Sequence, residues 1–164
     1  ELGALLHDVG DHKFRAHDGP AEIRKLLGRL GVGNKVTDEV VSINENISFS
    51  KGKRPDSGSI AFRIVQDADR LDAIGAIGIA RAFSYGGFRG NEIYDPHIKI
   101  TDPPLLAGAS TKSVSTIHHF YDKLLLLRDL MNTPTGRRLA EERHDYMVKY
   151  LEQFFTEWNP GNDL

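Results

Sequence analysis

The chain has 164 residues, a formal net charge of −2 and no cysteine. The length suits a single domain over residues 1–164 with its own hydrophobic core, while the weak net charge gives no general attraction to nucleic acid or to an anionic membrane. Disulfides and thiolate metal ligands are excluded. With no visible signal peptide and no apolar run long enough to cross a bilayer, the expected location is the cytoplasm.

Residues 1–10, ELGALLHDVG, have the pattern of a buried helix interior with no capping residue before it, so we expect further helices upstream of residue 1. At its end His7 and Asp8 are adjacent, and neighbours on a helix point about 100° apart, so both cannot pack into one core. They can converge on a divalent metal ion through imidazole nitrogen and carboxylate oxygen. A partly exposed histidine beside a capping aspartate is the alternative.

Three helices and a loop are predicted next. Apolar residues recur at helical spacing over residues 21–30, where the sequence GVGN ends the helix. Thr37 is the predicted N-cap of a helix over residues 38–47, and a loop rich in serine, glycine and cations follows. A long helix over residues 60–83 then runs through two glycines, each costing about 1 kcal/mol relative to alanine. Such a helix is expected to be central, where another backbone approaches it closely.

Three aspartates lie in this long helix, in the sequence VQDADRLDAIG. Arg63 and Arg70 can pair with Asp67 at helical spacings of four and three. Asp69 and Asp72 share another face and have no obvious partner, and like charges on a central helix cost stability unless a cation compensates them. The flanking apolar sequence offers no exposed face, which favours a metal-binding or catalytic role for Asp69 over three solvated carboxylates.

The remaining chain is predicted to be a long loop followed by two helices. Residues 84–109 contain several glycines and prolines, and a segment of this length is more typical of a lid or specificity loop than of a linker. A helix is predicted over residues 110–132, and Thr133-Pro134 predicts a capped start for the last helix. No strand is predicted, so the fold class is all-α.

Three segments in this order resemble the HD-domain superfamily of metal-dependent phosphohydrolases: LLHDVGD, DADRLDAIGAIG and the C-terminal sequence from TIHHFYDKLLLL to the end of the last helix. The C-terminal segment is similar to a bacterial subfamily that includes nucleotide pyrophosphohydrolases. The resemblance implies a helical bundle that holds one divalent cation, Mn²⁺ or Mg²⁺, with His7, Asp8 and Asp69 as ligands. The family's first histidine ligand would lie upstream of residue 1, unless His12 or His17 substitutes for it.

The resemblance also implies roles for residues near these ligands. Asp11 could accept a proton from the attacking water or orient it, the alternative being a loop residue bonded to its own backbone. Asp72 could bind a sugar hydroxyl or contact a metal ligand. The expected substrate-binding residues are cations and histidines, each of which could instead be a surface charge or, for one histidine, a buried side chain bonded to backbone: Lys13, Lys51, Arg81, His118, His119 and Lys123.

The expected reaction is hydrolysis of a (deoxy)nucleoside triphosphate to the monophosphate and pyrophosphate. One alternative is a nucleoside monophosphate phosphatase, and another is a degenerate HD domain that binds a nucleotide or a partner protein without turnover. The expected partner is a small-molecule nucleotide, with no nucleic acid and no membrane, and self-association into a homodimer is left open.

Overall fold

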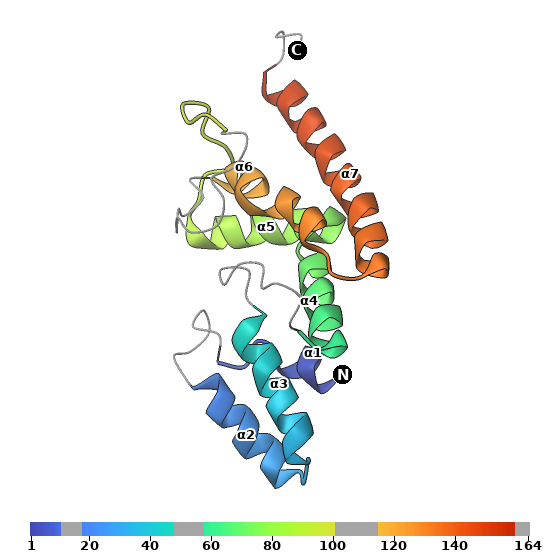
Figure 1. Cartoon of the computed structure of the whole chain (residues 1–164). Coiled ribbons are helices and arrows are strands. Elements are labelled where there is room, and N and C mark those ends of the chain that lie inside the picture. Colours follow the sequence, from blue (N-terminus) through green and yellow to red (C-terminus); the bar gives the residue numbers. More distant parts are fainter. Residues whose placement is uncertain (11–17, 48–57, 101–114, 160–164) are drawn as a thin grey trace. The chain divides into compact units, whose positions relative to one another are not determined.

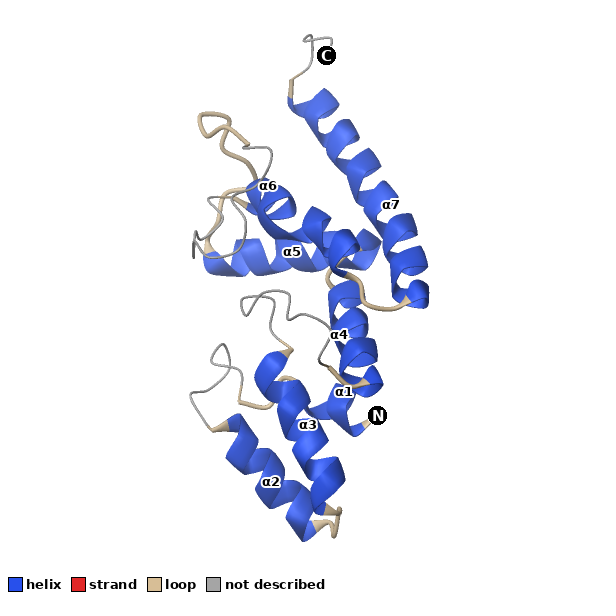
Figure 2. Cartoon of the chain, in the orientation of Figure 1, coloured by secondary structure: helices blue, strands red, loops and turns tan. Residues whose placement is uncertain are grey.

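The computed structural model describes residues 1–10, 18–47, 58–100 and 115–159, which form two compact units, Glu1–Gln66 and Asp67–Leu164 (Figure 1). Helices make up the regular structure of the described residues, and the one exception is an isolated β-bridge between Glu92 and Ser115 (Figure 2). The all-α prediction is confirmed. The assignment of residues 1–164 to one domain stays a prediction. None of the described helices combines the length and hydropathy needed to span a membrane.

The first unit contains α1 (Leu2–Leu6), α2 (Gly19–Arg29), α3 (Asn34–Asn46) and the N-terminal half of α4 (Ile60–Asp72). Asp18 caps α2, because its carboxylate accepts a 3.1 Å hydrogen bond from the Ala21 amide. The helices α2 and α3 pack against each other, as Figure 1 shows in blue and cyan. The apolar side chains buried in this unit are Ile23, Leu27, Val40, Val41, Ile43, Ile47 and Val65.

The predicted cap of α3 is wrong. The helix begins at Asn34 after Gly33, so Thr37 lies inside its first turn. The Thr37 side chain is buried, and its hydroxyl donates to the Gly33 carbonyl at 3.3 Å. A threonine in the first turn of a helix can make this bond in place of a capping bond, and sequence spacing does not separate the two cases.

The second unit contains the C-terminal half of α4, then α5 (Gly75–Arg89), α6 (Thr116–His119), the π-helical turn η2 (Phe120–Leu124), the 3₁₀-helix η3 (Leu125–Leu130) and α7 (Pro134–Trp158). Of the predicted helix over 110–132, residues 110–114 lie outside the described residues. The helical segment begins at Thr116 after Ser115 and runs to Leu130, with three hydrogen-bonding patterns in succession. The capped start at Thr133 is confirmed, because its hydroxyl accepts a 3.0 Å bond from the Gly136 amide. The helix α5 packs against α7 (Figure 1).

The predicted helix over residues 60–83 is divided into α4 and α5, which corrects the prediction. Gly75 has φ of +76°, a conformation that favours glycine. A Cβ atom at this position would also lie 2.9 Å from Cγ of Arg143. Gly75 therefore starts a helix instead of interrupting one. The helix α5 continues to Arg89, so the predicted loop over 84–109 is helical in its first six residues, and residues 101–109 lie outside the described residues.

Candidate functional site

His7 and Asp8 form the predicted metal-binding pair in the first unit. Nδ1 of His7 is 2.7 Å from the Ala4 carbonyl oxygen, so in the neutral imidazole Nδ1 donates and the lone pair is on Nε2. Metal-binding histidines are commonly oriented by such a bond. Nε2 is 3.2 Å from Oδ2 of Asp8, and ligand atoms at neighbouring octahedral positions with bonds of about 2.1 Å lie about 3 Å apart. The pair therefore fits a divalent cation.

Asn44 of α3 holds the turn that carries this pair. Its side-chain amide donates to the carbonyls of Leu6, His7 and Val9 at 3.1, 2.9 and 2.9 Å. Carbonyls at the end of a helix lack hydrogen-bond donors within that helix. Asn44 supplies a donor to the carbonyls at the end of α1. Asn44 is not among the predicted site residues. The available signal was a polar amide in a row of apolar residues on α3.

The aspartates of α4 lie on two faces of the helix in the second unit. At about 100° per residue, Asp67 and Arg70 lie about 60° apart, and Asp69 and Asp72 occupy the other side. Asp67 and Arg70 are only 3% and 5% exposed, whereas Asp69 and Asp72 are exposed. The expectation that the flanking apolar sequence has no exposed face is wrong, because Ala76, Ile77 and Ala80 of α5 are exposed.

Asp67 accepts four hydrogen bonds from the segment that precedes α7. Its Oδ1 accepts from the backbone and side-chain amides of Asn132 at 2.8 and 2.9 Å. Its Oδ2 accepts from the backbone amide and hydroxyl of Thr133 at 2.8 and 2.7 Å. Arg70 donates to the Leu130 carbonyl. Burial lowers the pKa of Arg70, and the nearby charges of Asp67 and Asp69 partly offset this effect. Sequence spacing predicted arginine partners for Asp67, and the hydrogen bonds come instead from a distant segment.

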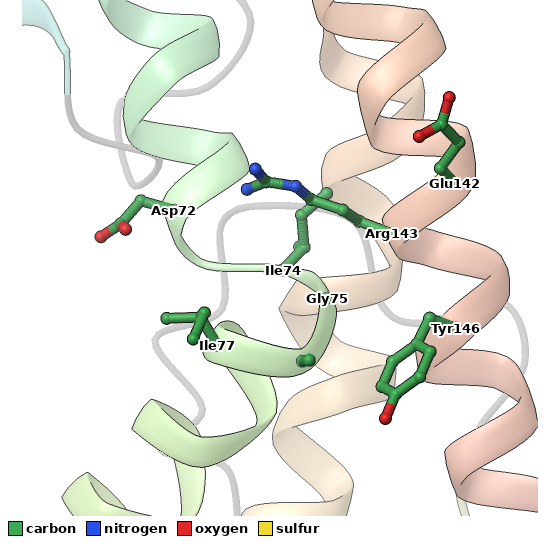
Figure 3. Close-up of a pocket in the computed structure, with 8 residues that line it drawn as sticks. Asp72, Ile74, Gly75, Ile77, Glu142, Arg143 and Tyr146 are labelled. Carbon is green, nitrogen blue, oxygen red and sulfur yellow. The ribbon is translucent and has the colours of Figure 1, made fainter.

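Asp72 and Arg81 form an ion pair across the break between α4 and α5, and Arg81 also donates to the Asp72 carbonyl at 3.3 Å. Both side chains are exposed and can be reached by a ligand. The substrate contacts predicted for them stay predictions. Asp72 also lines a pocket of about 380 Å³ with residues of α5 and α7 (Figure 3). Arg143 reaches from α7 toward the turn between α4 and α5 and donates to the Leu71 carbonyl (Figure 3).

The two histidines of α6 differ in their surroundings. His118 is buried; its Nδ1 is 2.7 Å from the Ser115 hydroxyl and its Nε2 is 3.1 Å from the Ile98 carbonyl oxygen. Tyr94 stacks on its ring at a centroid distance of 5.7 Å. The alternative that one of these histidines is a buried side chain bonded to backbone is therefore confirmed for His118. A substrate contact by His118 would require one of these bonds to be exchanged.

His119 lies at the junction of α6 and the π-helical turn η2. Burial is the main cause that lowers the pKa of His119, the charge of Lys123 adds to the shift and Asp122 opposes it, and the resulting pKa is about 4. The imidazole is therefore neutral at pH 7. A neutral histidine beside a lysine can still donate a hydrogen bond to a phosphate oxygen, so the predicted roles of His119 and Lys123 stay predictions.

The predicted site residues are thus divided between the two units. Asp11, Lys13 and Lys51 lie outside the described residues, as do His12 and His17. Within residues 1–10, 18–47, 58–100 and 115–159, no group of three or more histidine, aspartate or glutamate side chains is gathered as a metal site requires. The set of His7, Asp8 and Asp69 therefore stays a prediction.

Comparison with known proteins gives a consistent group of relatives. The chain is 40% identical to the uncharacterised protein YpgQ of Bacillus subtilis over 157 residues, which are 93% of this chain and 69% of YpgQ. The structure of an HD-superfamily hydrolase from Bacillus thuringiensis is 42% identical, with 97% of this chain and 72% of that one covered and a TM-score of 0.72.

YpgQ has also been crystallised in complex with ADP. That structure is 37% identical to this chain, with 99% of this chain and 74% of that one covered and a TM-score of 0.73. No family model matches the sequence.

Proposed function

The chain belongs to the HD superfamily of hydrolases, and we propose that it uses one divalent cation, Mn²⁺ or Mg²⁺, to hydrolyse a phosphate bond of a nucleotide. The observation that carries the proposal is the geometry of the His7-Asp8 pair. Nε2 of His7 and Oδ2 of Asp8 lie 3.2 Å apart, with Nδ1 of His7 bonded to the Ala4 carbonyl. An imidazole nitrogen and a carboxylate oxygen at this distance can bind one divalent cation together.

The residues that would hold the cation are His7, Asp8 and Asp69. When bound, such a cation neutralises charge on phosphoryl oxygens and lowers the pKa of a coordinated water. Asp11, three positions after Asp8, accepts the proton of the attacking water. The negative charge on the other phosphates is met by cationic side chains, which we assign as Lys13, Lys51, Arg81 and Lys123. His118 and neutral His119 are assigned as further substrate-binding residues.

A nucleotide is the proposed substrate because YpgQ, a relative over most of this chain, forms a complex with ADP. Within this class we propose a (deoxy)nucleoside triphosphate, cleaved between the α- and β-phosphates. The water oxygen then ends on the monophosphate, and pyrophosphate leaves. Asp72, exposed beside the pocket at the start of α5, is assigned to a sugar hydroxyl.

The test is a screen of nucleoside tri-, di- and monophosphates with Mn²⁺ or Mg²⁺, in which phosphate and pyrophosphate are measured separately. Equal amounts of monophosphate and pyrophosphate from a triphosphate are expected. Phosphate release from monophosphates alone would favour the phosphatase alternative, and binding without turnover would favour the degenerate domain. Asp69→Ala should abolish turnover and leave a folded protein, and unchanged turnover would contradict the ligand assignment.

A further inference from the structure

The C-terminal half of α4 has two polar faces with different surroundings. The face of Asp67 and Arg70 is buried in the second unit, and its groups bond the backbone of Leu130, Asn132 and Thr133. The opposite face carries exposed Asp69. Since Asp67 and Asp69 lie two residues apart on one rigid helix, the rotation that satisfies Asp67 also sets the direction in which Asp69 leaves the helix.

The bonds to Asp67 leave little freedom in this rotation. Four donors at 2.7 to 2.9 Å occupy both carboxylate oxygens. The carboxylate is 3% exposed, so water cannot replace a lost donor without cost. The Thr133 hydroxyl also accepts from the Gly136 amide, which connects Asp67 to the first turn of α7.

Gly136 makes this approach possible. A Cβ atom at position 136 would lie 2.4 Å from Oδ2 of Asp67, well inside van der Waals contact. The carboxylate would have to move away and would lose its bonds to Thr133. The absence of a side chain at position 136 is therefore part of the same arrangement.

We propose that Asp67 is a positioning residue, which, through its bonds to Asn132 and Thr133, fixes the rotation of α4 and so holds Asp69 in the orientation needed to bind the metal ion. This inference rests on the proposed function, in which Asp69 is a metal ligand. It goes further by giving the buried carboxylate of the DAD sequence, Asp67, the role of aligning the exposed carboxylate of Asp69.

The test is the dissociation constant for Mn²⁺ of the full chain, measured by electron paramagnetic resonance. Asp67→Asn keeps the size of the side chain. Each oxygen of Asp67 receives two donors, so the new amide group faces two donors whichever way it turns. We expect the Mn²⁺ dissociation constant to rise about 10- to 100-fold, the range found when residues that orient metal ligands are changed.

Matched controls separate positioning from a loss of stability. Leu151→Ala creates a cavity in α7 of the same unit, far along the helix from Thr133, and lowers the melting temperature. It should leave Mn²⁺ affinity within about twofold, because cavity effects stay local at this distance. Thr133→Ser keeps the hydroxyl and should resemble the wild type. Gly136→Ala should weaken Mn²⁺ binding in the same direction as Asp67→Asn.

Each outcome decides the proposal. A folded Asp67→Asn protein with wild-type Mn²⁺ affinity overturns it, as does an equal loss of affinity in Leu151→Ala. If Asp67→Asn does not fold, Thr133→Val, which removes one of the four bonds, replaces it, and unchanged affinity there overturns the proposal. If the wild type binds no Mn²⁺, or Asp69→Ala binds it equally well, the proposed function itself fails.

Discussion

The two units of the molecule hold their predicted metal ligands in opposite chemical ways. In the first unit the amide of Asn44 donates to carbonyls at the end of α1, beside His7 and Asp8. In the second unit the carboxylate of Asp67 accepts from amides just before α7, two residues from Asp69. A helix end exposes carbonyls and a helix start exposes amides. Each unit therefore supplies the matching polar group, half-buried Asn44 in one and buried Asp67 in the other, and the predicted ligands lie beside it.

The largest effect is expected from replacing the ligands themselves, one in each unit. His7→Ala and Asp69→Ala should each reduce Mn²⁺-dependent turnover more than about 100-fold, beyond the loss typical of supporting residues. Both side chains are at least partly exposed, so the free energy of unfolding should change by less than about 1 kcal/mol. Steady-state kinetics and urea unfolding measure the two quantities. A turnover loss in one variant only would place the metal ion in one unit.

The supporting residues should differ in their effect on stability. Asp67→Ala leaves four donors in a buried site without an acceptor and should lower the free energy of unfolding by about 3–5 kcal/mol. Asn44→Ala leaves carbonyls at a half-buried helix end and should cost about 1–2 kcal/mol. Urea unfolding measures both, with Asn46→Ala as the control, because Asn46 bonds a carbonyl on its own exposed helix face. Equal losses of unfolding free energy in Asp67→Ala and Asn44→Ala would contradict the expected difference between the two units.

Acid should destabilise the second unit through His119. An unfolded histidine titrates near pH 6.5, whereas the pKa of His119 in the fold is about 4. Between these values the unfolded chain binds a proton that the folded chain does not, so stability falls as the pH drops from about 6.5 to 4. The loss should reach at most about 3 kcal/mol. Urea unfolding between pH 7.5 and 4.5 measures it. His119→Gln should flatten this pH dependence of the unfolding free energy. An unchanged dependence in this variant would mean that other groups cause it.

Two glycines with positive φ, one in each unit, should differ in the cost of adding a side chain. Gly31 has φ of +69° and open space around it, so Gly31→Ala should cost about 1 kcal/mol of unfolding free energy. Gly75 has φ of +76°, and a Cβ atom there would contact Arg143, so Gly75→Ala should cost about 2–3 kcal/mol. Thermal unfolding measures both. Combining Gly75→Ala with Arg143→Ala tests whether the larger cost at Gly75 comes from this contact. Without the Arg143 side chain, the cost of Gly75→Ala should fall to that of Gly31→Ala.

Local features of the sequence predicted much of the fold. The helices around Ile23 and Val40 follow apolar periodicity, and Thr133-Pro134 marks the start of α7, because a cap depends only on residues within one turn. The break before Gly75 was missed for a physical reason. A glycine in a helical pattern can lie inside a helix at a modest cost or start a new one, and only its φ angle distinguishes these cases.

The features of the candidate site that depend on adjacent residues can be read from the sequence. The His7-Asp8 pair is visible in the sequence, and so is the group of aspartates on α4. The division of that group into buried Asp67 and exposed Asp69 was not, since it depends on Asn132 and Thr133, which are distant in the chain. The role of Asn44 was hidden for the same reason, because its acceptors belong to another helix.

The hydrogen bonds to Asp67 also have a consequence for the order of assembly. They join residues 65 and 66 positions apart, whereas those of Asn44 span 35 to 38 positions. A chain emerging from the ribosome therefore exposes α4 long before the residues that hold its second half have been synthesised. Because closing a longer loop costs more entropy, the turn around His7 can form early in translation, while the surroundings of Asp69 mature only once Thr133 has been added.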